Sequence, residues 1–104
     1  MNIIEQKQDS IFRLCELHKV KRLYAFGSAL TGNFNDESDV DLIVDFQDIP
    51  VEEYADNYFD FKFSLQDIFN RPVDLLENQA IKNPYFLHSI NKHKEIIYKQ
   101  KLTH

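Results

Sequence analysis

Two aspartates separated by one residue are the feature of the sequence with the clearest chemical meaning. Asp39 and Asp41 flank Val40, at the start of an apolar, β-branched segment that predicts a strand over residues 40–46. Side chains two residues apart on a strand leave the same face, about 7 Å apart. Two carboxylates this close repel each other unless a proton or a cation lies between them, and oxygen ligands of this kind suit Mg²⁺. The pair therefore predicts a metal site.

A third carboxylate, Asp74, lies on another predicted strand, over residues 73–77. If this strand pairs beside the first, three acids surround one or two metal ions. Phosphoryl-type transfer requires that arrangement, because metal ions stabilise the attacking and leaving oxygens of an in-line displacement. The alternative is that Asp74 is an ordinary surface acid, with Glu77 as its nearest substitute. Asp45 shares the strand parity of the first pair but is expected to be a solvated strand end.

Gly27 and Ser28 follow a short apolar segment, residues 23–26, that predicts a strand ending in a tight turn. Glycine lets the backbone approach a phosphate closely, and successive N–H groups at such a turn form an anion-binding concavity. The Ser28 hydroxyl adds a donor. A phosphate-binding turn beside a strand of carboxylates predicts a pocket for a metal-bound nucleoside triphosphate.

Hydrophobic periodicity and turn residues predict the elements that position these side chains. They are a helix over residues 2–18, strands over 23–26, 40–46 and 73–77, a long helix from Pro50 to residue 69, and a short helix to about residue 92 capped by Asn83. Residues 95–98 predict a last edge strand or a helical continuation. The order α-β-β-α-β-α predicts an α/β (α+β) fold class. We expect a single domain, residues 1–104, with a small mixed β-sheet and helices packed mainly on one face.

Composition excludes several classes of function. The net charge of −5 opposes broad contact with a phosphate backbone, so no direct nucleic-acid binding is expected. Cys15 is the only cysteine, which rules out an internal disulfide or a thiolate metal cage and favours a buried residue in a reducing, cytoplasmic setting. No apolar run approaches the roughly 18 residues of a membrane span. The 104 residues leave no room for a second lobe, so any substrate larger than a nucleotide must be bound partly by another chain.

The positions of some aromatic and basic residues allow more than one structural interpretation. Phe59 and Phe63 fall away from the main apolar stripe of the long helix, and a helix buried on two sides is favoured over an exposed contact patch. The four histidines lack metal-ligand spacing and are expected at the surface or at helix ends. The basic runs 92–94 and 99–101 are expected to be solvated ends, although either is able to reach a triphosphate.

The spacing of these residues resembles a known signature. Gly27-Ser28, ten intervening residues and then Asp39-Val40-Asp41 is similar to the signature of the polymerase-β-like nucleotidyltransferase superfamily, and Asp74 resembles its third acid. Length and element order are similar to the minimal nucleotidyltransferase (MNT) family in particular, over about residues 19–98. The resemblance implies that Gly27 and Ser28 hold the triphosphate, that Asp39 and Asp41 bind Mg²⁺, and that Asp74 completes the metal site and helps to activate the acceptor hydroxyl.

The resemblance also implies an activity and a partner. The expected reaction is Mg²⁺-dependent transfer of AMP, or another nucleoside monophosphate, from ATP or another NTP to a hydroxyl of a partner protein. The expected partner is a HEPN-domain toxin, with this chain as its antitoxin in a homo- or hetero-oligomer. One departure is that many relatives carry Arg in the turn after the Gly-Ser pair, where this chain has Ala29, Leu30 and Thr31. A catalytically silent antitoxin that acts by occlusion is therefore the second hypothesis, and the basic residue that meets the triphosphate is not identified.

Overall fold

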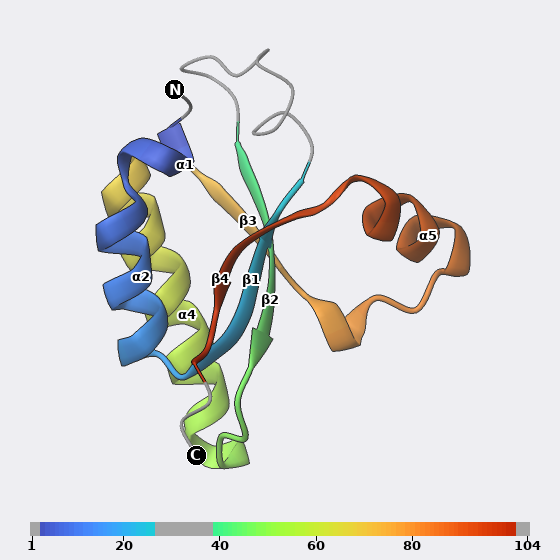
Figure 1. Cartoon of the computed structure of the whole chain (residues 1–104). Coiled ribbons are helices and arrows are strands. Elements are labelled where there is room, and N and C mark those ends of the chain that lie inside the picture. The colour runs from blue at the N-terminus through green and yellow to red at the C-terminus, as the bar shows by residue number, and fades with distance from the viewer. Residues whose placement is uncertain (1–2, 27–38, 102–104) are drawn as a thin grey trace.

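The computed structural model describes residues 3–26 and 39–101 of the chain. Figure 1 shows a sheet with helices on both of its sides. The elements in chain order are α1 (Ile3–Gln6), α2 (Gln8–Leu17), β1 (Val20–Ala25), β2 (Val40–Phe46), α4 (Val51–Phe69), β3 (Val73–Glu77), a 3₁₀ turn η1 (Asn78–Ala80), α5 (Pro84–His93) and β4 (Glu95–Lys99).

The sheet is mixed, with strand order β3-β2-β1-β4. The strand β1 pairs antiparallel with both β2 and β4, whereas β2 and β3 are parallel and are joined through the long helix α4. Helices α1, α2 and α4 cover one face of the sheet, and α5 lies on the other side (Figure 1). The predicted fold class, a small mixed sheet with helices mainly on one face, is confirmed.

The core lies between the sheet and the α2–α4 layer. Every second residue of the strands points into it, and α4 contributes residues at helical spacing, which is the pattern that the sequence shows. The fully or almost fully buried members are Ile11, Cys15, Val20, Leu23, Ala25, Val40, Leu42, Val44, Phe61, Leu65, Phe69, Val73 and Leu75. Burial of Cys15 is as predicted, and this burial, followed by the charge of Glu16, raises the pKa of its thiol to about 12. Among the described residues, no helix is long and apolar enough to cross a membrane.

Two boundaries at the N-terminal end differ from the prediction. The first helix is divided at Lys7 into α1 and α2. The first strand begins at Val20, not at Leu23, so the basic residues Lys21 and Arg22 lie in β1. The strand starts early because Val20 is fully buried and pairs with Phe46, and this tertiary contact outweighs the local polarity of the segment.

Two open alternatives are resolved by the structure. Residues 95–99 form the edge strand β4 and not a continuation of α5. Phe59 and Phe63 are 49% and 55% exposed, so the expectation that they are buried is wrong. Their rings stack on each other with centroids 6.0 Å apart, on a side of α4 that is turned away from the core residues Phe61 and Leu65.

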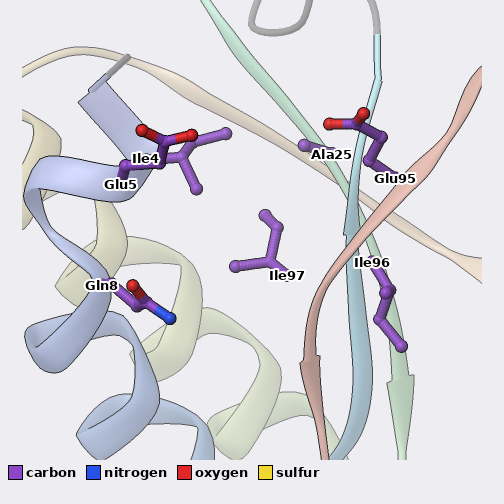
Figure 2. Close-up of a pocket in the computed structure, with 7 residues that line it drawn as sticks. All are labelled: Ile4, Glu5, Gln8, Ala25, Glu95, Ile96 and Ile97. Atoms are coloured by element: carbon purple, nitrogen blue, oxygen red, sulfur yellow. The ribbon is translucent and has the colours of Figure 1, made fainter. Parts of the chain in front are cut away.

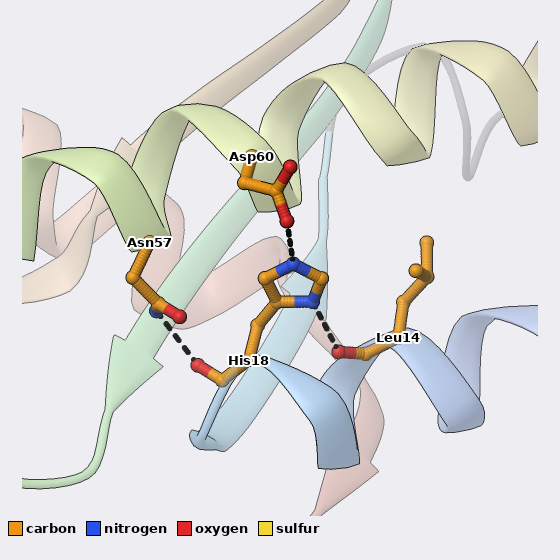
Figure 3. Close-up of polar contacts among 4 residues, drawn as sticks. All are labelled: Leu14, His18, Asn57 and Asp60. Atoms are coloured by element: carbon orange, nitrogen blue, oxygen red, sulfur yellow. Dashed lines mark hydrogen bonds and ion pairs between the residues drawn. The ribbon is translucent and has the colours of Figure 1, made fainter.

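A buried histidine joins the two long helices (Figure 3). His18 ends α2, and its Nδ1 lies 2.8 Å from the carbonyl oxygen of Leu14 one turn earlier. Its Nε2 lies 2.6 Å from Oδ2 of Asp60 on α4, and Asn57 Nδ2 donates to the His18 carbonyl oxygen at 2.8 Å. The helix-end role predicted for the histidines is confirmed for His18, and the contact fixes α2 against α4.

Candidate functional site

Parallel pairing of β2 with β3 sets Asp41 and Asp74 beside each other. The two residues are direct partners in the register, so their side chains leave the same face of the sheet from strands about 4.8 Å apart. The structure therefore brings together the acids that were predicted to meet. Glu77, the alternative to Asp74, lies at the other end of β3, where its Oε2 accepts a hydrogen bond of 2.7 Å from the Tyr54 hydroxyl.

The backbone at this end of β2 is fixed from both sides. The N–H of Phe26, just after β1, donates to the Asp41 carbonyl oxygen at 3.1 Å, and the N–H of Val40 donates to the Pro72 carbonyl oxygen at 3.0 Å. Val40 and Leu42 are buried toward the α2–α4 layer, so Asp41 between them points to the opposite face. The alternation of apolar and acidic residues in the sequence thus fixes the side of the sheet on which the carboxylates lie.

Electrostatics link all three predicted acids. Burial raises the pKa of Asp41 first, and the charges of Asp74 and then Asp39 raise it further. Asp39 lies just before β2 and is exposed, as is Asp74, whereas Asp41 is half-buried. Asp39 and Asp74 are therefore both close enough to destabilise the charged form of Asp41.

The chemistry of these donors fits a divalent cation. Within residues 3–26 and 39–101, no group of three or more His, Cys, Asp or Glu side chains is already arranged as a metal cage. The three carboxylates are neighbours that repel one another, and a cation among them would offset the repulsion that raises the pKa of Asp41. Hard oxygen ligands of this type are those that Mg²⁺ takes in proteins.

Asp45 lies outside this acidic group. It is at the far end of β2, pairs in register with Arg22 of β1, and its Oδ2 lies 4.0 Å from Arg22 Nη1. Its separation from Asp39 and Asp41 agrees with the prediction. The expectation of a solvated strand end is wrong, because Asp45 is half-buried and belongs to a cross-strand ion pair.

Gly27 and Ser28 lie outside the described residues, so their predicted role stays a prediction. The strand that precedes them is described, and it ends at Ala25, which pairs with Leu42 of β2. The chain therefore leaves β1 at the same end of the sheet at which Asp41 lies.

A basic side chain from the run 92–94, which the sequence left as a solvated end or a contact for a triphosphate, lies on the same face. Lys94, directly before β4, has its Nζ 4.1 Å from the centroid of the Tyr24 ring. Tyr24 pairs with Ile43, which lies two residues from Asp41 on β2 and shares its face. Lys94 was treated as part of a solvated run, but it is half-buried. The signal that would have found it is the assignment of residues 95–99 as the strand that pairs with β1.

A small pocket lies at the same end of the sheet but on the helical side (Figure 2). Its volume is about 160 Å³, and its lining comes from α1, α2, β1 and β4. The apolar side chains of Ile4, Ala25 and Ile97 line it together with two carboxylates, Glu5 and Glu95. Carboxylates repel phosphate, so this pocket does not suit a triphosphate.

Comparison with known sequences gives the family of the chain. A family model described as polymerase beta, nucleotidyltransferase matches residues 9–102. Two proteins of Methanocaldococcus jannaschii, both named as candidate protein adenylyltransferases, are 36% and 33% identical to this chain over 85 residues, and each match covers 82% of both chains.

Solved structures share the fold. One described as a minimal nucleotidyltransferase superposes with a TM-score of 0.75 at 21% identity, over 91% of this chain and 95% of that one. A toxin-antitoxin structure with AMP-PNP gives a TM-score of 0.69 at 18% identity, over 90% of this chain and 74% of that one. A tri-AMPylated Shewanella oneidensis HEPN toxin in complex with MNT antitoxin gives 0.63 at 16% identity, over 93% and 73%.

The similarity to these solved structures shows the fold, and the sequence matches show the family. The family model spans most of the chain, and the M. jannaschii proteins are similar over most of their own length. The chain that pairs Asp41 with Asp74 on adjacent parallel strands therefore belongs to the polymerase β nucleotidyltransferase family.

Proposed function

We propose that this chain is a Mg²⁺-dependent nucleotidyltransferase that moves AMP from ATP to a hydroxyl group of a partner protein. The observation that carries the proposal is the β2–β3 register, which sets Asp41 beside Asp74, with Asp39 two residues upstream. Support for the acceptor class comes from relatives named as candidate protein adenylyltransferases, and support for the nucleotide comes from the similar fold described with AMP-PNP.

Three carboxylates have separate parts in the proposed reaction. Asp39 and Asp41 would hold Mg²⁺, with Asp74 completing the site; when bound, the ion would stabilise negative charge on the transferring phosphate. The acceptor hydroxyl oxygen attacks the α-phosphorus, the bond from that phosphorus to the β-phosphate bridging oxygen breaks, and pyrophosphate leaves. The hydroxyl proton passes to Asp74, which is exposed at the sheet edge and thus accessible to a macromolecular acceptor. Gly27 and Ser28 are proposed to hold the triphosphate.

The proposed partner is a HEPN-domain toxin, which this chain would silence as its antitoxin. The described residues form one sheet with its flanking helices, and a protein acceptor would bring its own binding surface to the acids. One structure with this fold is described as a tri-AMPylated HEPN toxin in complex with MNT antitoxin. The transfer would attach AMP to the toxin through a phosphodiester bond.

The test is the intact mass of the partner co-expressed with this chain, after incubation with ATP and Mg²⁺. We expect added AMP with the wild type and none with Asp41→Asn. Asp45→Asn is the matched control, because Asp45 has the same strand and parity but faces Arg22 at the other end of β2. Transfer by Asp41→Asn at the wild-type rate would overturn the assignment of the metal site.

A silent antitoxin is the second candidate, and the residues after Ser28 favour it. Ala29, Leu30 and Thr31 stand where many relatives carry Arg, which removes one cation from the triphosphate. In this case the toxin is neutralised by occlusion, no mass is added with any nucleoside triphosphate, and Asp41→Asn neutralises the toxin as well as the wild type does.

A further inference from the structure

A nucleotide site on this chain would bring negative charges of the ligand and of the protein together. A triphosphate carries several negative charges, the chain has a net charge of −5, and the candidate site itself contains Asp39, Asp41 and Asp74. A metal ion offsets only part of this repulsion. A cationic side chain on the same face of the sheet is therefore needed, and the sequence after Ser28 has none at residues 29–31.

Register places Lys94 in the row of residues that contains the two paired aspartates. Ala25 is the partner of Leu42 on one side and of Glu95 on the other. Phe26, the residue after Ala25, donates its N–H to the Asp41 carbonyl oxygen, and Lys94 is the residue before Glu95. The backbones of Lys94 and Asp41 are thus separated by two strand spacings, about 10 Å.

The side chain of Lys94 lies on the face that carries the acids. Tyr24 alternates with the buried residues Leu23 and Ala25, so its ring is on the side opposite the α2–α4 layer, where Asp41 also points. The Nζ of Lys94 is 4.1 Å from the centre of this ring. The ammonium group therefore lies over the ring of Tyr24 on β1, the strand between β4 and β2, on the face from which Asp41 projects.

Contact with an aromatic face leaves the ammonium group able to bind an anion. A cation–π contact is electrostatic and uses no hydrogen-bond acceptor, whereas the ammonium has three N–H donors. Tyr24 and Lys94 are both half-buried, so neither residue is closed off from solvent. Lys92 and His93 have a simpler explanation, since they are exposed in the last turn of α5, where cations are favoured.

We propose that Lys94 binds the triphosphate, held in place by Tyr24, and supplies the positive charge that residues 29–31 lack. The inference rests on the proposed function, because it names the residue that contacts the phosphates of that nucleotide. Lys94 lies at one side of the phosphates and the three aspartates lie at the other, so a metal-bound triphosphate would lie across the ends of β1 and β2.

The test is the affinity of the full chain for MgATP and for AMP, measured by titration calorimetry. We expect Lys94→Met to weaken MgATP binding by about 10- to 100-fold, which is the usual effect of losing a hydrogen bond to a charged group. Binding of AMP, which lacks the β- and γ-phosphates, is expected to change by less than about threefold. Lys94→Arg should keep MgATP affinity near that of the wild type, and Lys99→Met, at the far end of β4, is the matched control.

Tyr24 is a positioning residue in this proposal, and its variants separate position from charge. Tyr24→Phe keeps the aromatic ring and should keep MgATP affinity. Tyr24→Leu removes the ring and should weaken MgATP binding several-fold. Its affinity for AMP should stay the same, whereas a loss of folding would weaken the binding of both nucleotides. Lys94→Met preserves the aliphatic stem, and its circular dichroism spectrum is expected to match that of the wild type.

The outcomes distinguish this inference from the proposed function. If wild type binds MgATP and Lys94→Met binds it equally well, the role of Lys94 is overturned and the nucleotidyltransferase assignment stands. If Lys94→Met weakens AMP and MgATP equally, the residue does not act on the β- and γ-phosphates and the inference is overturned. If the wild type itself binds no MgATP, the proposed function fails and the inference fails with it.

Discussion

At the scale of single residues, Asp41 is a proposed metal ligand whose charge lowers the stability of the metal-free protein. Its pKa is raised by burial and by the charges of Asp74 and Asp39, so its charged form destabilises the fold when no cation is present. We therefore expect Asp41→Asn to increase the free energy of unfolding in Mg²⁺-free buffer by about 0.2–1 kcal/mol, the range for removing like charges on adjacent strands. Urea denaturation near neutral pH, with a chelator present, measures this change.

Asp45→Asn is the control for that measurement, and it should behave in the opposite direction. Asp45 faces Arg22 at 4.0 Å, so the substitution removes an attractive contact and lowers stability slightly or leaves it unchanged. A clear loss of stability in Asp41→Asn would show that the carboxylate makes a favourable contact in the metal-free protein, against the repulsion argued here.

The acids could be assigned individually from the sequence, whereas Lys94 was named only as part of the basic run 92–94. Asp39 and Asp41 are local in sequence, so strand parity alone places them on one face. Asp74 required one further assumption, that β3 pairs beside β2, and the structure bears it out. Lys94 depends on an edge strand that pairs with β1 across more than 60 residues and on a ring contact with Tyr24, and no local pattern carries that information.

At the scale of elements, His18 is expected to be a structural link between α2 and α4. Its ring bonds to the carbonyl oxygen of Leu14 and to Asp60, and its own carbonyl oxygen accepts from Asn57. Replacing it with Ala removes the two ring contacts, with the Leu14 carbonyl oxygen and with Asp60, and keeps the backbone contact with Asn57. It also opens space beside Phe61, whose ring centroid is 5.4 Å from that of His18. We expect His18→Ala to lower the free energy of unfolding by about 1–3 kcal/mol.

Thermal and urea unfolding measure the effect of His18→Ala, with His88→Ala as the control. His88 is exposed on α5, and its replacement should change stability by less than about 0.5 kcal/mol. Equal effects of the two substitutions would contradict the linking role. MgATP affinity should not change in His18→Ala as long as the variant is folded, because the contact lies in the helical layer behind the sheet.

Element types followed from the sequence more closely than element boundaries. The strand over residues 40–46 and the helix that ends at residue 69 agree with the prediction because periodicity is sustained and the helix is closed by Asn70, in the left-handed conformation with φ 55°. Strand β1 begins early because Val20 is buried by the rest of the molecule. Phe59 and Phe63 were placed in the core because the sequence cannot tell which side of a long helix the fold leaves uncovered.

At the scale of the whole molecule, an acidic chain is proposed to bind a polyanion, and this requires the metal ion. With a net charge of −5, nucleotide without Mg²⁺ should bind weakly, whereas the metal-bound nucleotide meets the carboxylates through the ion and Lys94 directly. The size, the acidic balance and the single-cysteine composition were all available from the sequence. The sequence did not show that the acids and Lys94 lie on one face of the sheet, because that placement depends on how the strands pair.

Ligand linkage converts this argument into a stability measurement on the intact chain. A ligand that binds only the folded state stabilises it, by about 2.7 kcal/mol at a concentration 100 times its Kd. For a domain of this size, that corresponds to a rise in Tm of roughly 10 °C or more. We expect this rise with ATP and Mg²⁺ together, and little rise with ATP plus a chelator. Asp41→Asn should lose most of the shift because the metal loses a carboxylate, and Lys94→Met should lose part of it because the phosphates lose one cation. An equal shift with and without Mg²⁺ would mean that the nucleotide binds away from the acids on β2 and β3.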